Sequence, residues 1–438
     1  MKEFSPYHIT HVHLHESLQM PDLKQENQGN YLVFWWHSVA LGELYVEPNE
    51  NITHEQYFQK LGKALKPALD FYASGQRTAG LEQLLPSGDF HGFVSAMESL
   101  FAKSASQTIP SRVPVSVVIC TRNRPVALKR CLESLRQSIC QPAEIIIIEN
   151  ARENDETEKL VETFAGVKYF QEPVPGLSHA RNTGVKKATH SIIAFTDDDV
   201  IVHPEWVFRV WEAFTKHEVA AMTGLVIAAE LETETQLIFE RCWSFNRGYV
   251  DILYEENYFN QNLPSGPPVW EIGAGANMAF RKEVFEEIGL FDVRLGAGAS
   301  GCSEDSEVWY RILQHQHSIL YYPKAAVFHA HRKDLRSLRK QIFAYMRGFT
   351  MAVLVQQDHF PAANYRNRLF RQYPKHYLQL VARGFPRYRF RNRTLWEEIM
   401  GILSGYAFYL KNRKNDPKTQ FVREEPAPQL KPEQELTT

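Results

Sequence analysis

The chain has 438 residues, 44% of them hydrophobic, and a formal net charge of −2. This length excludes a single ordinary domain and favours two or three compact units with apolar cores. No apolar run is long enough to span a bilayer, and the five cysteines contain no C-x-x-C pair. Because residues 1–10 also lack a basic stretch followed by an apolar one, we expect a reducing, cytoplasmic setting.

Residues 1–110 are predicted to form a small, separate α+β module of unknown role. Apolar runs predict strands over residues 31–42 and 43–46, and the helical spacing of apolar residues predicts a helix over residues 55–74. This module contains no recognisable catalytic constellation. The polar stretch 103–112 is typical of a linker to the next unit.

Three histidines alternate near the start of the chain. On a strand, His11, His13 and His15 would share one face. Three imidazoles so placed could bind zinc, but an exposed strand face is the favoured interpretation.

From residue 113 the sequence alternates between buried strands and helices. The β-branched run 115–120 predicts a strand buried on both faces, a helix follows from Pro125, and a second strand over 144–148 precedes a helix over 153–164. This order, with short connections, predicts a parallel sheet with right-handed crossovers, in which ligands bind beyond the carboxyl ends of the strands. Polar residues stand at those ends, Thr121 to Arg124 after the first strand and Glu149–Asn150 after the second.

Three consecutive carboxylates, Asp197, Asp198 and Asp199, end the apolar run 191–196. Charges crowded at the end of a buried strand repel one another unless a cation or donor groups neutralise them. Mg²⁺ and Mn²⁺ prefer such oxygen ligands, so we predict a divalent-metal site here. On this segment alone, a solvated acidic turn is the alternative.

The stretch 175–184 predicts a helix start that suits an anion. Gly176 permits a sharp turn, Ser178 can cap the helix, and Arg181 and Asn182 lie in its first turn. Backbone N–H groups at that position favour a phosphate. An ordinary capped surface helix is the alternative.

A glycine-rich loop follows later in the chain. Gly296, Gly298 and Gly301 match the G-x-G-x-x-G spacing of dinucleotide-binding turns. We reject that interpretation, because no buried strand precedes the loop and the acidic pair Glu304–Asp305 after it would repel a pyrophosphate. We expect instead a loop that brings these two carboxylates over a pocket.

Two further strands are predicted over residues 319–322 and 326–328, and they lead to His329 and His331. A histidine at the carboxyl end of a strand is a usable metal ligand. Histidines in such a position are nevertheless more often structural.

The carboxyl-terminal part is strongly basic. Residues 332–393 contain fifteen lysines and arginines against two acids. Helical periodicity from Leu335 to Phe349, with aromatic and basic residues beyond it, suits an anionic membrane surface. The alternative is that these helices pack on the preceding domain and show their charge to water. Residues 395–410 predict a shorter apolar helix, and residues 413–438 have the composition of a disordered tail.

Taken together, residues 115–332 resemble family 2 glycosyltransferases of the GT-A fold. Seven motifs stand in the family's order, and this agreement is far more specific than any one of them. They are the first-strand segment 115–124, Glu149 where the family usually has aspartate, Gly176 with residues 180–182, Asp197 to Asp199 as a D-x-D motif, residues 275–278, residues 289–292, and Glu304–Asp305.

The resemblance implies an α/β fold: a mixed, nucleotide-binding sheet flanked by helices over residues 111–332, beside the amino-terminal module and a basic helical region over 333–412. It also implies a nucleotide-diphosphate sugar as donor. Thr121 and Arg124 would line the nucleoside pocket, Glu149 would reach the base or ribose, and Arg181 would lie near the diphosphate. The expected substrate-binding set is completed by Arg122, Asn123, Asn182, Asp197, Asp198, Gly275, Asn277 and Glu304.

The resemblance further implies that Asp199, Asp197 and His329 bind Mn²⁺ or Mg²⁺, with His329 preferred to His331, and that Asp305 is the catalytic base. One metal-binding carboxylate site and one separate carboxylate base suffice for a single displacement, so we expect inversion at the anomeric carbon. Of the three aspartates, we expect Asp198 to tolerate substitution best.

We therefore expect a transferase for polysaccharide or glycolipid synthesis, with a glycan or lipid-linked acceptor and no nucleic-acid partner. It would be cytoplasmic, with peripheral attachment to the inner membrane face through residues 332–393. One alternative is a Mg²⁺-dependent phosphohydrolase, whose D-x-D motif Asp197 to Val200 half fits. The other is a non-catalytic protein of the same fold that binds sugar nucleotides or membranes.

Overall fold

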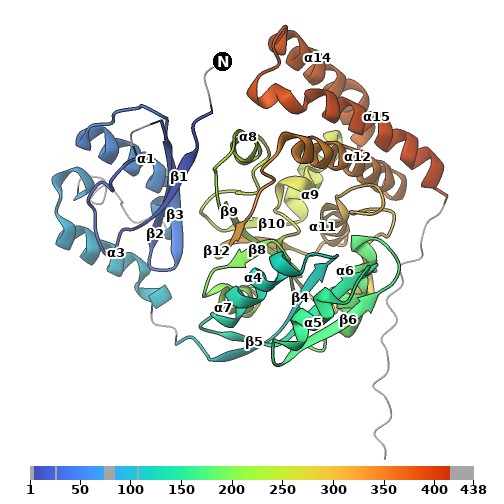
Figure 1. Cartoon of the computed structure of the whole chain (residues 1–438), viewed down its shortest axis with the longest axis horizontal. Coiled ribbons are helices and arrows are strands. Elements are labelled where there is room, and N and C mark those ends of the chain that lie inside the picture. The colour runs from blue at the N-terminus through green and yellow to red at the C-terminus, as the bar shows by residue number, and fades with distance from the viewer. Residues whose placement is uncertain (1–3, 25–26, 74–83, 106–107, 415–438) are drawn as a thin grey trace, which may run out of the picture.

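The computed structural model describes residues 4–24, 27–73, 84–105 and 108–414. Its centre is a mixed sheet in which, over the described residues, the strands run in the order β10-β12-β9-β11-β7-β4-β5-β6, and β8 pairs with β12 (Figure 1). The strands are β4 (Arg112–Thr121), β5 (Gln141–Asn150), β6 (Val167–Glu172), β7 (Ile192–Asp197), β8 (Val200–Val202), β9 (Ala221–Ala228), β10 (Ile252–Tyr254), β11 (Asn277–Arg281) and β12 (Ile319–His329). The predicted mixed α/β sheet is confirmed.

The apolar runs form strands because both faces of this sheet are covered. Along β4, Val117 and Ile119 enter the apolar core on one face, whereas Val118 enters the core on the other. Helices α4 (Pro125–Arg136) and α7 (Trp206–Lys216) cover the first core, while α6 (Leu177–Lys187) and α11 (Glu304–Gln314) cover the second. Shorter helices complete the layers: α5 (Glu156–Glu162), α8 (Glu234–Trp243), α9 (Glu256–Asn262) and α10 (Val284–Ile288).

The carboxyl ends of several strands meet at one edge of the sheet. Strand β4 pairs in parallel with both β5 and β7, and β12 pairs in parallel with β9. The two strands predicted over 319–322 and 326–328 are one strand, β12, with an irregularity between Tyr322 and Ala326. This edge therefore collects the polar residues that follow β4, β5, β7 and β12.

The amino-terminal module has a three-stranded sheet of β1 (Tyr7–His13), β2 (Gly29–Trp36) and β3 (Val39–Val46), with helices α1 (His54–Tyr72) and α3 (Phe90–Ala105). The break between strands falls at His37, whose φ of 51° makes the turn, and not at residues 42–43 as predicted. The predicted linker 103–112 begins as helix, and residues 106–107 lie outside the described residues.

The three amino-terminal histidines are not arranged as a metal-binding group. His15 follows the end of β1, and His11 Nδ1 accepts a hydrogen bond of 3.0 Å from Trp35 Nε1. No metal-binding group in the described ranges includes any of the three. Trp35 itself stacks on His203, 5.4 Å away between ring centroids, so this module packs directly on the central sheet.

The predicted basic helix is α12 (Leu335–His359). Its first half carries the basic residues, whereas its second half, including Met351 and Val353, belongs to the same apolar core as β7 and β11. Beyond it lie α13 (Tyr365–Asn367), α14 (Tyr373–Gly384) and α15 (Leu395–Asn412), of which α14 and α15 form the outermost layer (Figure 1). None of the described helices is long and apolar enough to span a membrane. Of the predicted disordered tail, residues 413–438, the part from residue 415 onward lies outside the described residues.

One buried carboxylate, Glu144 on β5, links three strands at the end of the sheet opposite the carboxyl edge, because it bonds to Ser116 on β4 and Lys168 on β6. Burial opposes ionisation of Glu144, but hydrogen bonds from Lys168 Nζ, Ser116 Oγ and the Thr189 backbone hold its pKa at about 2. A carboxyl group with a depressed pKa stabilises the fold above its unfolded value near 4.5, and this contribution is lost as the pH falls through the folded value.

We therefore expect the wild-type chain to lose about 3 kcal/mol of unfolding free energy from Glu144 between pH 4.5 and pH 2. Urea unfolding of wild type and Glu144→Gln across this window measures the contribution as the difference between the two curves. The variant should be less stable at neutral pH and less sensitive to acid. If the unfolding free energies of wild type and Glu144→Gln change in parallel with pH, Glu144 is not held ionised in the folded protein.

Candidate active site

A cavity of about 790 Å³ opens at the carboxyl edge of the sheet. Strand ends form one wall of it, and the start of α11 and the middle of α12 form the other. The predicted site residues that line it are Thr121, Arg122, Arg124, Arg181, Asp197, Asp198, Asp199, Gly275, Glu304, Asp305 and His329. The structure thus brings together residues that are up to 208 positions apart in the chain, from Thr121 to His329.

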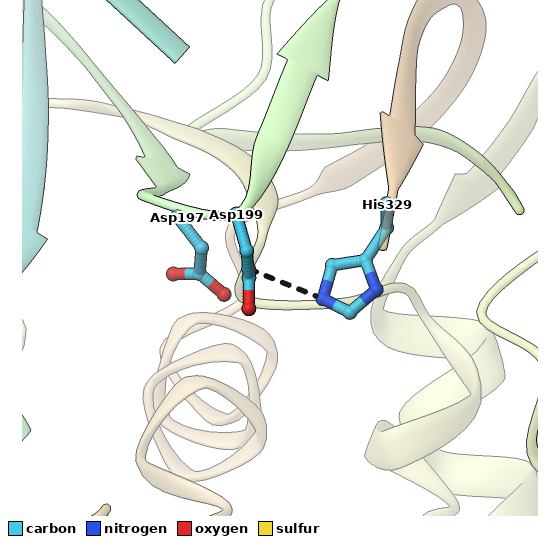
Figure 2. Close-up of side chains that lie close together, drawn as sticks. All are labelled: Asp197, Asp199 and His329. Carbon is cyan, nitrogen blue, oxygen red and sulfur yellow. Dashed lines mark ion pairs between the residues drawn. The ribbon is translucent and has the colours of Figure 1, made fainter. Parts of the chain in front are cut away.

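Asp197, Asp199 and His329 form the candidate metal-binding group found among the described residues. Asp197 ends β7, Asp199 lies in the turn to β8, and His329 ends β12, and Figure 2 shows their side chains turned toward a common point. One ligand atom of each lies within 4.8 Å of the others, and His329 Nε2 is 3.5 Å from Asp199 Oδ1. Two carboxylate oxygens and one imidazole nitrogen could hold a divalent cation.

A series of hydrogen bonds determines which ring nitrogen of His329 carries the proton. His331 Nε2 lies 2.7 Å from Glu240 Oε2, and a carboxylate only accepts, so His331 donates there and its Nδ1 must accept. That acceptor lies 3.1 Å from His329 Nδ1, which therefore donates. His329 Nε2 is left with a lone pair toward Asp199, which is the form a metal ligand needs. His331 stands behind His329 and is not a member of the metal-binding group.

The hydrogen bonds from His329 through His331 to Glu240 predict that metal affinity depends on His331 and Glu240, although neither is a proposed metal ligand. In the double variant Glu240→Gln/His331→Phe, His329 Nδ1 has no acceptor, and no unpaired carboxylate remains buried. We expect its Kd for Mn²⁺ to rise about 10- to 100-fold, measured by electron paramagnetic resonance of the free ion. Glu240→Gln alone keeps an acceptor for His331 and serves as the milder control. If the double variant binds Mn²⁺ with wild-type affinity, the hydrogen bonds through His331 and Glu240 do not position His329.

Arginine and hydroxyl donors neutralise part of the aspartate triplet. Arg124 donates to Asp198 Oδ1 and, over 2.9 Å, to Asp199 Oδ2, while Thr121 Oγ1 donates to Asp198 Oδ2 over 2.7 Å. Burial raises the pKa of Asp198 to about 7 against the opposing charge of Arg124. Burial also opposes ionisation of Asp199, but the proximity of His329 and Arg124 keeps its pKa below the ordinary value.

The contacts of Asp198 change our expectation for it. Its side chain is almost fully buried and bonded to two neighbours, so it is a structural link between β4 and β7. It should therefore tolerate truncation poorly, contrary to the prediction from sequence.

A second group of charges surrounds Arg181. Its Nη1 lies 2.5 Å from Glu304 Oε1, and its Nη2 lies 3.3 Å from the Gly275 carbonyl and 3.6 Å from Asp197 Oδ1. Burial raises the pKa of Glu304 to about 7 and that of Asp197 to about 6, although Arg181 opposes both shifts. Five carboxylates line the cavity, and two of its six cationic side chains, Arg124 and Arg181, pair with them.

The glycine loop shapes the wall that carries Glu304 and Asp305. Gly301 has a φ of 127°, and a Cβ atom there would lie 2.4 Å from the Ala344 carbonyl oxygen, so the loop can approach α12 only without a side chain. Ser303, directly before α11, is held at a φ of 70°. Asp305 follows in the first turn, where its Oδ1 accepts a 2.7 Å hydrogen bond from the Ser306 N–H, and it stays partly accessible from the cavity.

Four predicted substrate-binding residues do not line the cavity. Asn277 is buried, with its side chain bonded to Trp206 and to the Leu225 and Ala325 carbonyls. Asn182 bonds to the backbone of Phe291, and Asn123 accepts from the Glu153 N–H. Glu149 is fully buried against the Tyr169 hydroxyl, 2.5 Å away. In this structure the first three side chains are engaged by other groups of the protein, so their role in substrate binding stays a prediction.

The cavity also has lining residues that sequence reasoning missed. Asn150 lines it in place of its neighbour Glu149, a position that the strand-end rule had already marked. Arg247, Arg332 and Lys340 add cations, and no ion pair joins them to any acid in the part of the chain that the structure describes. Six aromatic residues also line the cavity: Trp243, Phe245, Trp270, Tyr345, Phe349 and Tyr373.

Comparison with known proteins bears on what this site is. The sequence model of the family "Glycosyl transferase family 2" matches residues 116–289. A glucosyl-dolichyl phosphate glucuronosyltransferase of Haloferax volcanii is 22% identical over 188 residues, 42% of this chain and 57% of that protein. A pre-mycofactocin glycosyltransferase of Mycobacterium tuberculosis is 25% identical over 230 residues, 52% of this chain and 45% of that protein. The chain thus spans about half the length of these curated relatives.

Solved structures with a similar chain path include a mannosyltransferase from Pyrobaculum calidifontis in complex with GDP-Man and Mn²⁺. It has a TM-score of 0.44 and 14% identity, and the similarity covers 73% of this chain and 95% of that one. GalNAc-T7 with UDP, GalNAc and Mn²⁺ has a TM-score of 0.39 and 21% identity, over 55% of this chain and 48% of that one. With the sequence match and the mixed sheet, residues 116–289 form a domain of glycosyl transferase family 2.

Proposed function

We propose that the chain is an inverting, metal-dependent glycosyltransferase, which moves a sugar from a nucleotide-diphosphate sugar to an acceptor hydroxyl. The observation that carries this proposal is the convergence of Asp197, Asp199 and His329 in one cavity with a separate, accessible carboxylate, Asp305. The family of residues 116–289 supports the same reaction class.

The donor set supports Mn²⁺ as the cofactor. Carboxylate oxygens suit both Mg²⁺ and Mn²⁺, but Mg²⁺ dehydrates reluctantly and is rarely held by imidazole, so the nitrogen of His329 favours Mn²⁺. When bound, the cation would neutralise negative charge on the diphosphate leaving group. Arg181, already oriented by Glu304, would add a guanidinium donor on the same side.

Asp305 would act on the acceptor. Its carboxylate accepts the proton of the acceptor hydroxyl while the hydroxyl oxygen forms a bond to the anomeric carbon. The bond from that carbon to the diphosphate oxygen breaks, and its electron pair leaves with the nucleoside diphosphate. Attack opposite the leaving group inverts the configuration at the anomeric carbon.

The aromatic lining around Trp270 and Phe349 is the proposed acceptor site. These two rings lie edge to face, 4.8 Å apart between centroids, Arg247 donates to the Trp270 carbonyl over 3.0 Å, and Lys340 lines the same cavity. This chemistry suits a glycan with an anionic group, including one linked to a lipid through phosphate. One relative is named for such an acceptor, glucosyl-dolichyl phosphate.

The cellular setting and the division of the chain are also proposed. We infer a role in polysaccharide or glycolipid synthesis at the cytoplasmic face of the membrane. Basic residues of the predicted segment 332–393 support contact with an anionic membrane surface. We retain residues 111–332 as the catalytic domain and residues 1–110 as an accessory module.

Release of nucleoside diphosphate from a panel of sugar nucleotides, with and without Mn²⁺, tests the proposal. We expect Mn²⁺-dependent release from one donor class and no phosphate release from simple phosphomonoesters. The comparisons offer no support for the phosphohydrolase alternative. Phosphomonoester cleavage would revive it, and failure with every donor would favour a non-catalytic protein.

A further inference from the structure

Helix α15 is apolar on two sides, but only one of them is covered. Gly401 and Gly405 turn toward α12, where a Cβ atom would lie 2.7 Å from the Phe343 carbonyl oxygen and 2.5 Å from that of Arg347. The two helices can approach so closely only because these positions are glycine. This contact fixes the orientation of α15 and leaves its other side facing outward.

The outward side of α15 carries large apolar side chains in helical register. Trp396, Met400, Leu403 and Leu410 are between 48% and 59% exposed, and spacings of four, three and seven residues place them on one face. Tyr406, which is 41% exposed, lies beside Phe370, which is 56% exposed, with 6.0 Å between the ring centroids. We call these six residues the α15 surface. A contiguous apolar area of this kind on a protein surface marks an interaction site.

The segment that precedes α15 in sequence is basic. Residues 359–396 contain nine arginines and lysines and no aspartate or glutamate, and of these cations Arg391 pairs with Glu398 and Arg393 with Glu234. The two acids that open α15 are both paired, Glu398 with Arg391 and Glu397 with Arg339, 3.3 Å away. Beside them, a groove of about 420 Å³ between α12 and α15 is lined by Arg336, Arg339 and Lys340.

We propose that the α15 surface lies in the interface of an anionic membrane, with α15 parallel to the membrane plane. The apolar side chains would enter the boundary between headgroups and acyl chains, and the surrounding arginines would contact lipid phosphates. Tryptophan and tyrosine, both present on the α15 surface, prefer this interfacial depth. Helix α15 itself is not long and apolar enough to cross the bilayer. The membrane contact then lies in α15 and at Phe370, and it goes beyond the transfer reaction itself.

A second copy of the chain is the competing occupant. In a two-fold symmetric dimer the same surface meets itself, so the basic rim of one protomer would face the basic rim of the other. Like charges brought together in this way oppose association. The charge therefore favours an anionic lipid surface over self-association.

Flotation with vesicles tests the proposal in the full chain, without any sugar donor, so its outcome is independent of the transfer activity. We expect binding to vesicles of phosphatidylcholine mixed with phosphatidylglycerol and much weaker binding to phosphatidylcholine alone. The double variant Met400→Asp/Leu403→Asp should lower the partition coefficient at least about tenfold. Ile139→Asp, at a similarly exposed apolar position in the turn after α4, is the matched control and should bind like wild type.

Quenching by brominated lipid measures insertion directly. Trp396 is one of eight tryptophans, so the difference between wild type and Trp396→Phe isolates its fluorescence. We expect this difference signal to be quenched in mixed vesicles. An unquenched signal, or vesicle binding that the Asp variants leave unchanged, would overturn the proposal. Dimers in sedimentation that the double variant dissociates, without vesicle binding by wild type, would assign the α15 surface to self-association instead.

Discussion

Asp305→Asn is expected to lower kcat for sugar transfer by about 10²- to 10⁴-fold, because an amide cannot accept the proton of the acceptor hydroxyl. The amide oxygen can still accept the hydrogen bond from the Ser306 N–H, so the start of α11 should keep its geometry. Donor binding in the presence of Mn²⁺ should therefore remain close to wild type. Steady-state kinetics and calorimetric titration with the donor measure the two effects separately.

Asp155→Asn provides the matched control for this experiment. Asp155 is an acid at the start of α5 that pairs with Lys159 at the surface, away from the cavity. Its substitution should change neither transfer nor donor binding. If Asp305→Asn loses donor binding together with transfer, its side chain holds the donor. If transfer persists, another group takes the proton.

Asp199→Asn is expected to weaken Mn²⁺ binding more than about 100-fold, since it removes a charged ligand, and even neighbours that only orient ligands account for 10- to 100-fold. Transfer at a fixed, limiting Mn²⁺ concentration should fall in proportion. The amide oxygen can still accept from Arg124, so the turn between β7 and β8 should stay folded. Titration of the free ion by electron paramagnetic resonance measures the affinity.

Asp198→Asn tests whether Asp198 is itself a metal ligand or only supports the residues that are. Asp198 has a pKa raised to about 7 by burial, so its protonated form resembles the amide in shape and charge. Its amide oxygen would still accept from Arg124, and its NH2 group would donate to the Thr121 hydroxyl. We expect near wild-type Mn²⁺ affinity in this variant. A loss as large as that of Asp199→Asn would mean that Asp198 coordinates the ion.

The positions of the strand-end residues could be predicted from sequence because a parallel sheet brings carboxyl ends to one edge. Thr121 after β4 and Asp197 at the end of β7 lie at neighbouring strand ends, since β4 pairs with β7 in parallel. His329 could be placed only through the family resemblance. Its strand, β12, is separated from β7 by β11 and β9, and local periodicity in the sequence does not reveal the order in which these strands pair.

The sequence could not place every polar side chain, because a residue type does not reveal whether its side chain faces a ligand or a distant part of the same protein. The partners of Asn277 stand 48 to 71 residues away in sequence. The α15 surface was missed for a related reason. An apolar helix of this length indicates burial, and only the close contact of Gly401 and Gly405 with α12 shows which side is left uncovered.

A thermal-shift measurement with sugar nucleotides, with and without Mn²⁺, on wild type and Asp199→Asn tests the central claim most directly. A ligand that binds only the folded chain, present at about 100 times its Kd, stabilises it by about 2.7 kcal/mol. We expect one donor class to raise the Tm of the wild type only when Mn²⁺ is present, and to have no such effect on the variant. A shift that is equal without Mn²⁺, or that persists in Asp199→Asn, would contradict a metal-dependent donor site at the end of β7.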